Sequence, residues 1–150
     1  NYSTFIGTDK ADTARLMRYF HNVYGIIPVT NKLEITAGFD VGMQQKVKGG
    51  NSMNTWYSPV VIVRYAAGLN WAIAARGEYY ADKNSVVISS GTTNGFQTAG
   101  FSFNVDYAPA PNALIRIEAR TLKSKDEIFT KRNGVSDNNS FITSSLAISF

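Results

Sequence analysis

Residues 33–43 alternate without a break between apolar side chains and polar or small ones. Leu33 and Phe39 belong to the apolar set, and Glu34 and Asp40 belong to the polar set. Because successive side chains of a strand point to opposite faces, this predicts a β-strand with one apolar and one polar face. The same alternation recurs over residues 71–82, 97–107, 113–122 and 142–150.

The two sets differ in a way that is unusual for a water-soluble protein. The polar sets carry charges of both signs with glycine and small hydroxyl residues, whereas the apolar sets end in aromatic residues. In a soluble sandwich the apolar face forms a bulky core and the polar face meets water. An apolar exterior around a polar interior is instead stable in a bilayer. We therefore expect an all-β fold, a transmembrane antiparallel meander β-barrel with about eight strands in this chain.

Two kinds of connection alternate between the predicted strands. Short turns with Pro, Gly or Asn cover residues 28–31, 67–70 and 109–112, and long polar connections cover 46–54, 83–96 and 124–139. Transmembrane barrels show this alternation, with short periplasmic turns and long external loops. We therefore place the short turns and Phe150 at the periplasmic end. The predicted strands span residues 2–8, 15–27, 33–45, 55–66, 71–82, 97–107, 113–122 and 140–150.

Composition sets further bounds on a chain of 150 residues, which we expect to form a single domain over residues 1–150. It has no cysteine, which excludes a disulfide framework and a thiolate metal site. The longest apolar run, near residues 60–63, is ended by Arg64 and is too short for a membrane-spanning helix. The net charge is only +4, and the lysines fall mostly in the predicted loops rather than beside exposed aromatic residues, so we expect no nucleic-acid partner.

Aromatic residues are spaced to form two rows along neighbouring strands. Tyr57 and Tyr65 lie eight positions apart, as do Trp71 and Tyr79 on the next predicted strand. Eight tilted residues cover roughly 20 Å of the bilayer normal, close to the height of an outer-membrane apolar band. These residues, with Tyr107, are therefore predicted to form aromatic girdles at the lipid interface. The alternative is that aromatic residues simply favour strands.

Charged residues of both signs fall on the side of the strands predicted to face inward. Two strands carry the pattern Arg-x-Glu, and a step of two keeps both charges on one face. Such charges either interlock and plug a narrow barrel or line a water-filled pore and set its selectivity. The predicted lumen-lining residues are Glu34, Asp40, Arg64, Arg76, Glu78, Asp106, Arg116, Glu118 and Arg120.

The sequence offers little support for enzymatic chemistry. His21 is the one histidine, and no group of residues has metal-ligand spacing. His21 is in register with the apolar set, and neither Ser144 nor Ser145 sits in a glycine-flanked elbow of the kind that activates a nucleophile. We therefore expect no enzyme, no catalytic residue, no metal site and no cofactor.

Several segments resemble one family of membrane proteins. They are WAIAARGEYYAD at 71–82, FSFNVDYAPAPNALIRIEARTLKSKDEIF at 101–129 and the closing SSLAISF. From about residue 15 to residue 150, the chain resembles the C-terminal portion of the OmpL-like β-barrel porin family of Gram-negative bacteria. The resemblance implies an outer-membrane location and identifies Leu146, Ile148 and Phe150 as an assembly signal. It also implies a barrel larger than this chain, because members of the family are longer.

These patterns are compatible with three functions, and we expect the first of them. The first is a porin-type passive diffusion channel for small polar solutes. The second is a closed eight-stranded structural or binding barrel, and the third is a lipid-modifying outer-membrane enzyme. A soluble lipocalin-like barrel would need its charges outside, the reverse of the pattern here. The expected partners are outer-membrane lipid, lipopolysaccharide and the barrel-assembly machinery, and oligomerisation stays open.

Overall fold

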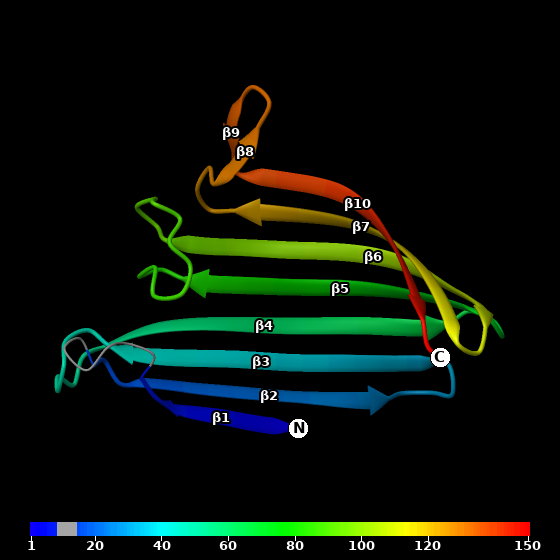
Figure 1. Ribbon diagram of the computed structural model, residues 1–150, viewed down its shortest axis with the longest axis horizontal. Coiled ribbons are helices and arrows are strands. Elements are labelled where there is room, and N and C mark those ends of the chain that lie inside the picture. Colours follow the sequence, from blue (N-terminus) through cyan, green and yellow to red (C-terminus); the bar gives the residue numbers. More distant parts are fainter. Residues whose placement is uncertain (9–14) are drawn as a thin grey trace.

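The computed structural model describes residues 1–8 and 15–150, which form strands and connections without a helix (Figure 1). Eight strands form one sheet in the order β1-β2-β3-β4-β5-β6-β7-β10, and β8 and β9 form a separate hairpin. The main strands are β1 (Tyr2–Gly7), β2 (Arg18–Pro28), β3 (Leu33–Gln45), β4 (Met53–Ala66), β5 (Trp71–Asp82), β6 (Phe96–Ala110), β7 (Ala113–Ser124) and β10 (Asn138–Ile148). The hairpin consists of β8 (Phe129–Lys131) and β9 (Gly134–Ser136).

All pairings in the large sheet are antiparallel, so the predicted all-β meander is confirmed. The short turns that follow β2, β4 and β6 lie at one end, and the long connections after β3, β5 and β7 lie at the other (Figure 1). The first short turn is closed by the Thr30 hydroxyl, which accepts the backbone N–H groups of Lys32 at 3.2 Å and Leu33 at 3.0 Å. The assignment of the short turns to the periplasm stays a prediction.

The register of the strands gives the sheet two chemically distinct faces. Glu34 lies opposite Arg64, and the same row continues through Ala74, Asn104 and Glu118. The neighbouring row contains Leu33, Tyr65, Ile73, Val105 and Ile117. We call the side that carries the first row the polar face and the side that carries the second row the apolar face.

Burial along β6 is the reverse of that in a soluble sheet. On the apolar face Phe101 is 55% exposed and Phe103 is 43% exposed, whereas on the polar face Ser102 is 2% and Asn104 8% exposed. The polar side chains are covered by neighbouring side chains on their own face. A row of large exposed apolar residues needs an apolar environment, which a bilayer supplies.

The eight predicted strands correspond to the eight strands of the large sheet, and the differences among these lie at their ends. β2 begins at Arg18, β6 extends at both ends, and β10 spans Asn138–Ile148 rather than 140–150. β10 stops there because its partner β7 begins at Ala113, and one last hydrogen bond, Ser149 N–H to Asn112 O at 3.0 Å, follows. The β8–β9 hairpin inside the predicted 124–139 connection was not expected, since three-residue strands carry no readable alternation.

The sheet is open. β1 and β10 form its two edges, and no pairing joins them within residues 1–8 and 15–150. β1 is also shorter than its neighbour, since it pairs with β2 only from Arg18 to Val23. The described strands therefore form an arc of wall rather than a closed cylinder.

Candidate functional site: paired charges on the polar face

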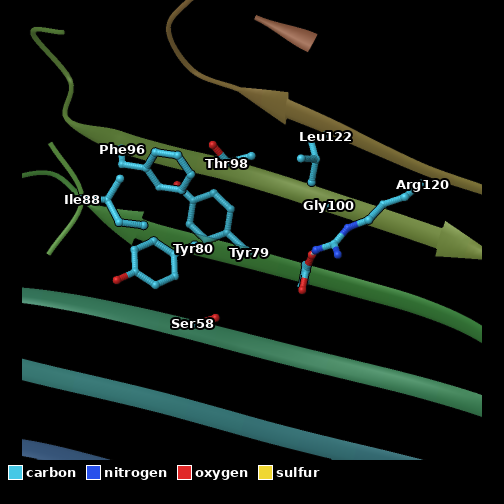
Figure 2. Close-up of a pocket in the computed structure, with 10 residues that line it drawn as sticks. Ser58, Tyr79, Tyr80, Ile88, Phe96, Thr98, Gly100, Arg120 and Leu122 are labelled. Carbon is cyan, nitrogen blue, oxygen red and sulfur yellow. The ribbon is translucent and has the colours of Figure 1, made fainter. Parts of the chain in front are cut away.

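A carboxylate shared by two arginines occupies the middle of the polar face. Glu78 on β5 accepts hydrogen bonds from Arg76 at Oε2 and from Arg120 at Oε1. Figure 2 shows Arg120 on one side of Gly100, and because Arg120 belongs to β7 and Glu78 to β5, their contact crosses the intervening strand β6. It can do so because Gly100 of β6 lies opposite Glu78, where a Cβ atom would stand 2.6 Å from Glu78 Oε1. The glycine opens the space in which the three charges meet.

A second ion pair lies closer to the short turns. Arg116 donates from Nε to Asp106 Oδ1 and from Nη2 to Asp106 Oδ2, both at 2.7 Å. This two-point geometry fixes the guanidinium plane as well as its position. Asn104 Nδ2 donates to the same Oδ1 at 2.8 Å. The Asp106 side chain is buried, whereas the Arg116 side chain is 41% exposed. The carboxylate therefore fixes the position of a guanidinium that stays partly exposed on the polar face.

A third polar group lies near the long connections. Arg18 donates to Gln44 Oε1 from Nε at 3.0 Å and from Nη2 at 2.6 Å. Its guanidinium carbon also lies 5.4 Å from the centre of the Trp56 ring, a cation–π arrangement. Four residues further along β2, Asn22 donates to Asp40 across the β2–β3 pair.

All nine residues predicted to line a lumen lie on the polar face. The structure brings together Arg76, Glu78 and Arg120, and separately Asp106 and Arg116. Glu118 lines a cavity of about 170 Å³ with Arg64, Arg76 and Arg116. That this face borders water stays a prediction.

Several residues of the polar face were not singled out from the sequence. They share the face with the charges and could have been found by extending the alternation along each strand, and they are Gln44, Trp56, Ser58, Thr98, Gly100 and Asn104. Their contacts could not have been found in this way, because each depends on the register of a neighbouring strand.

The predicted girdle residues all lie on the apolar face, in two groups. Trp71 and Tyr107 stack at the short-turn end with ring centroids 4.5 Å apart. Tyr57 and Tyr79 are 6.1 Å apart at the other end, and Tyr65 lies opposite Leu33 near the short turns. Their contact with lipid headgroups stays a prediction.

The predicted assembly signal lies at the edge strand. Leu146 and Ile148 are exposed on β10 beside the apolar face, and Phe150 follows the end of that strand and is fully exposed. Its recognition during assembly stays a prediction.

The histidine and the two serines considered for catalysis lie on strands near opposite edges of the sheet. His21 lies on the apolar face with its Nδ1 2.8 Å from the Tyr2 hydroxyl and 3.1 Å from the Thr4 hydroxyl. Ser144 and Ser145 lie on β10, at the opposite side of the sheet. Within residues 1–8 and 15–150, no group of His, Cys, Asp or Glu could hold a metal ion, and no helix is long and apolar enough to cross a membrane.

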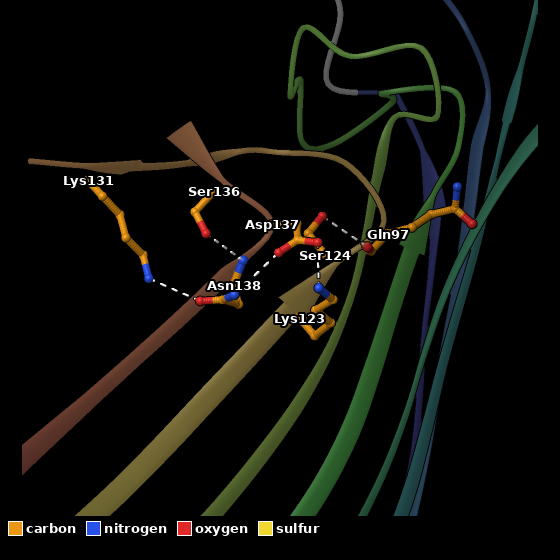
Figure 3. A network of polar contacts seen from close by, with 7 residues as sticks. All are labelled: Gln97, Lys123, Ser124, Lys131, Ser136, Asp137 and Asn138. Atoms are coloured by element: carbon orange, nitrogen blue, oxygen red, sulfur yellow. Dashed lines mark hydrogen bonds and ion pairs between the residues drawn. The ribbon is translucent and has the colours of Figure 1, made fainter. Parts of the chain in front are cut away.

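The loop ends of β6, β7 and β10 are tied by a polar network (Figure 3). Ser124 Oγ donates to the Gln97 carbonyl at 3.1 Å, and Lys123 donates to Asp137. This hydrogen bond from Lys123 holds the pKa of Asp137 below its usual range. A second tie joins two loops, because the Asp126 carboxylate accepts Asn94 Nδ2 at 2.7 Å and the Asn94 backbone N–H at 3.0 Å.

Comparison with known proteins places this geometry in a family. The family model described as "Putative beta-barrel porin-2, OmpL-like" matches residues 1–150. The searches of curated proteins and of solved structures returned no match. The family match covers every strand of the sheet and agrees with its antiparallel meander and its reversed burial. The chain therefore belongs to the OmpL-like β-barrel porin family.

Proposed function

We propose that this chain forms part of the wall of a passive diffusion channel for small polar solutes in the outer membrane of a Gram-negative bacterium. The apolar face meets lipid, and the polar face borders the aqueous lumen. The observation that carries the proposal is the reversed burial of β6, with Phe101 and Phe103 exposed and Ser102 and Asn104 buried. Membership of a porin family supports the same assignment.

The open sheet favours a wide barrel over a small plugged one. In lipid every backbone hydrogen-bonding group needs a partner, so the free edges of β1 and β10 require further strands beside them. The guanidiniums also favour a wet interior, since the side chains of Arg76 and Arg116 are 40% and 41% exposed. In a plugged eight-stranded barrel, side chains would fill the interior and bury such groups.

The paired charges interact electrostatically with solutes that pass along the wall and catalyse no reaction of them. Carboxylates fix the arginines against the wall, so cations and anions alternate along the solute path. Such a channel needs no cofactor and no catalytic residue. The proposed partners are lipid and lipopolysaccharide around the wall, and the assembly machinery at Leu146, Ile148 and Phe150.

Planar-bilayer recording of the intact protein tests this proposal. We expect stable stepwise conductance that scales with the salt concentration of the bath. Protein that is denatured before it is added should give no conductance. Insertion into the bilayer without conductance would overturn the proposal and favour a structural or binding barrel. Lipid hydrolysis that is lost in His21→Ala would instead favour an enzyme.

A further inference from the structure

The long connection between β5 and β6 folds back over the polar face of the sheet. Asp82, the last residue of β5, lies four residues beyond Glu78, and an even step along a strand keeps both side chains on the polar face. The Asp82 carboxylate accepts the backbone N–H groups of Val86 at 2.9 Å, Val87 at 2.7 Å and Ile88 at 3.0 Å. Residues 86–88 of the connection therefore lie on the polar side of the sheet.

A cavity of about 230 Å³ lies between this connection and the strands (Figure 2). Ile88 lines it from the connection, and residues of four neighbouring strands line it from the sheet, from Ser58 on β4 to Leu122 on β7. Between these, Tyr80 and Phe96 are in edge-to-face contact with ring centroids 5.6 Å apart. The connection thus overhangs the polar face across several strands and occupies part of the space that this face borders.

The chain reverses direction directly after β5. Ser85 donates its backbone N–H to the Asp82 carbonyl at 3.2 Å, and its φ is 51°. This is the left-handed region, which residues with a Cβ atom rarely adopt and which persists only where the surrounding structure enforces it. The hydrogen bonds to the Asp82 carboxylate hold the residues that follow, and they keep the reversal in place.

Both arms of the connection are anchored. Asp82 is fully buried, so its hydrogen bonds to the first arm are shielded from competing water, and hydrogen bonds to a charged acceptor are stronger than neutral ones. On the second arm, the Asn94 carbonyl accepts Gln97 Nε2 at 2.8 Å, and the Asn94 side chain donates to Asp126 of the next long connection at 2.7 Å. Residues 83–95 are therefore fixed over the polar face rather than free to swing away from it.

We propose that residues 83–95 form a permanent constriction of the lumen at the end of the long connections, and that Asp82 is the positioning residue that holds it. The constriction sets an upper limit on solute size that the wall alone would not impose, and Ile88 lies within it. This inference rests on the proposed function, because the connection narrows a solute path only if the polar face borders the lumen.

Asp82→Asn in the intact protein tests the role of the carboxylate. An amide has one acceptor oxygen and two N–H donors, so it cannot accept all three backbone N–H groups. Hydrogen exchange at residues 86–88, measured in micelles, should become about 10- to 100-fold faster, which corresponds to the loss of one hydrogen bond to a charged group. Single-channel conductance should rise, and liposomes that contain the variant should admit larger sugars in a swelling series of arabinose, sucrose and stachyose.

Asp137→Asn is the matched control for this change. It removes a carboxylate at the same end of the sheet, one that accepts a hydrogen bond from Lys123 between β9 and β10 and does not line the cavity. Its conductance and its size limit for sugars should equal those of the wild type. Heat-dependent migration in gel electrophoresis confirms that each variant is folded.

Thiol modification tests the position of the connection independently of Asp82. The chain has no cysteine, so a single introduced thiol reports only on its own surroundings. Ile88→Cys, treated with a charged, water-soluble thiosulfonate, should lose conductance because the added group narrows the constriction further. Val135→Cys, 59% exposed on the β8–β9 hairpin that stands apart from the sheet (Figure 1), should react and keep its conductance.

The outcomes separate this inference from the proposed function. A wild type without conductance would overturn the channel and the constriction with it. A conducting wild type whose conductance is unchanged by modification of Ile88→Cys would overturn the constriction alone, and this result decides even if Asp82→Asn does not fold. A folded Asp82→Asn variant with the conductance and size limit of the wild type would overturn the role of Asp82.

Discussion

The indole of Trp56 occupies the space above Gly42, its cross-strand neighbour, where a Cβ atom would otherwise stand. The guanidinium of Arg18 lies over the same indole and is held by Gln44. Arg18 of β2 and Trp56 of β4 thus stack above β3, and the stack depends on the absence of a side chain at Gly42.

Replacing this glycine should disrupt the stack. We expect Gly42→Val to lower the free energy of unfolding by about 1–3 kcal/mol, because the indole must leave its position. Gly77→Val is the matched control, since a Cβ atom at Gly77 meets no atom within 4 Å. Urea unfolding in lipid vesicles, followed by tryptophan fluorescence, measures both. Equal stability of the two variants would contradict the packing seen at Trp56.

The two faces should respond differently to a buried charge. Ile117→Arg places a cation on the apolar face, where Ile117 is exposed, and should cost about 2–4 kcal/mol if that face lies near the bilayer midplane. Thr36→Arg places the same cation on the polar face and should cost less. The free energies of unfolding in vesicles provide the comparison. Equal costs at the two positions would argue against lipid on the apolar face.

Removing the shared carboxylate should change selectivity more than stability. Glu78→Gln leaves Arg76 and Arg120 without an anion, so the reversal potential in a salt gradient should shift toward anions. The loss of stability should stay below the about 3–5 kcal/mol of a buried pair, because water reaches Arg76.

Glu127→Gln, in the connection between β7 and β8, serves as the control for this change and should leave the reversal potential unchanged. A large fall in melting temperature, with no conductance in either variant, would indicate a plugged barrel instead.

The contact between Asp126 and Asn94 should survive mild acid. The side-chain hydrogen bond from Asn94, with further hydrogen bonds from Thr92 and the Asn94 backbone, lowers the pKa of Asp126. A lowered folded-state pKa means that the contact stabilises the loops above the ordinary carboxyl pKa and is lost as pH falls through the lowered value.

The Asn94 amide resonance, followed by NMR against pH in micelles, should therefore shift only below the ordinary titration range of aspartate. Asp126→Asn should abolish that shift. A transition at the ordinary carboxyl pKa would show that the tie between the two loops is absent in solution.

The alternation of side chains along five segments, together with the two kinds of connection, was enough to predict the eight strands of the large sheet. The prediction works because side chains along a strand alternate between its two faces, so that a strand with one apolar and one polar face shows a period of two in its sequence. Strand ends were less well predicted. They depend on where the neighbouring strand stops, as at Ile148 and Ala113.

The spacing of charged residues in the sequence could not predict which of them form ion pairs. Both Arg-x-Glu patterns look alike, yet Arg76 pairs with Glu78 while Arg116 pairs with Asp106 on the adjacent strand. Glu78 also reaches Arg120 across a strand because Gly100 leaves room. Such contacts depend on cross-strand register and on the size of the intervening residue, and neither can be read from one strand alone.

The alternation along β6 has a consequence for how such a protein can change over time. Under the proposed function Phe101 and Phe103 contact lipid, and Ser102 and Asn104 lie on the side of the lumen, although all four are consecutive in the chain. If that function holds, substitutions at even-numbered positions of this strand alter the lumen surface without altering the surface that contacts lipid. Solute preference and compatibility with the membrane would then depend on alternating residues, so that either property could be engineered or could evolve while the other is conserved.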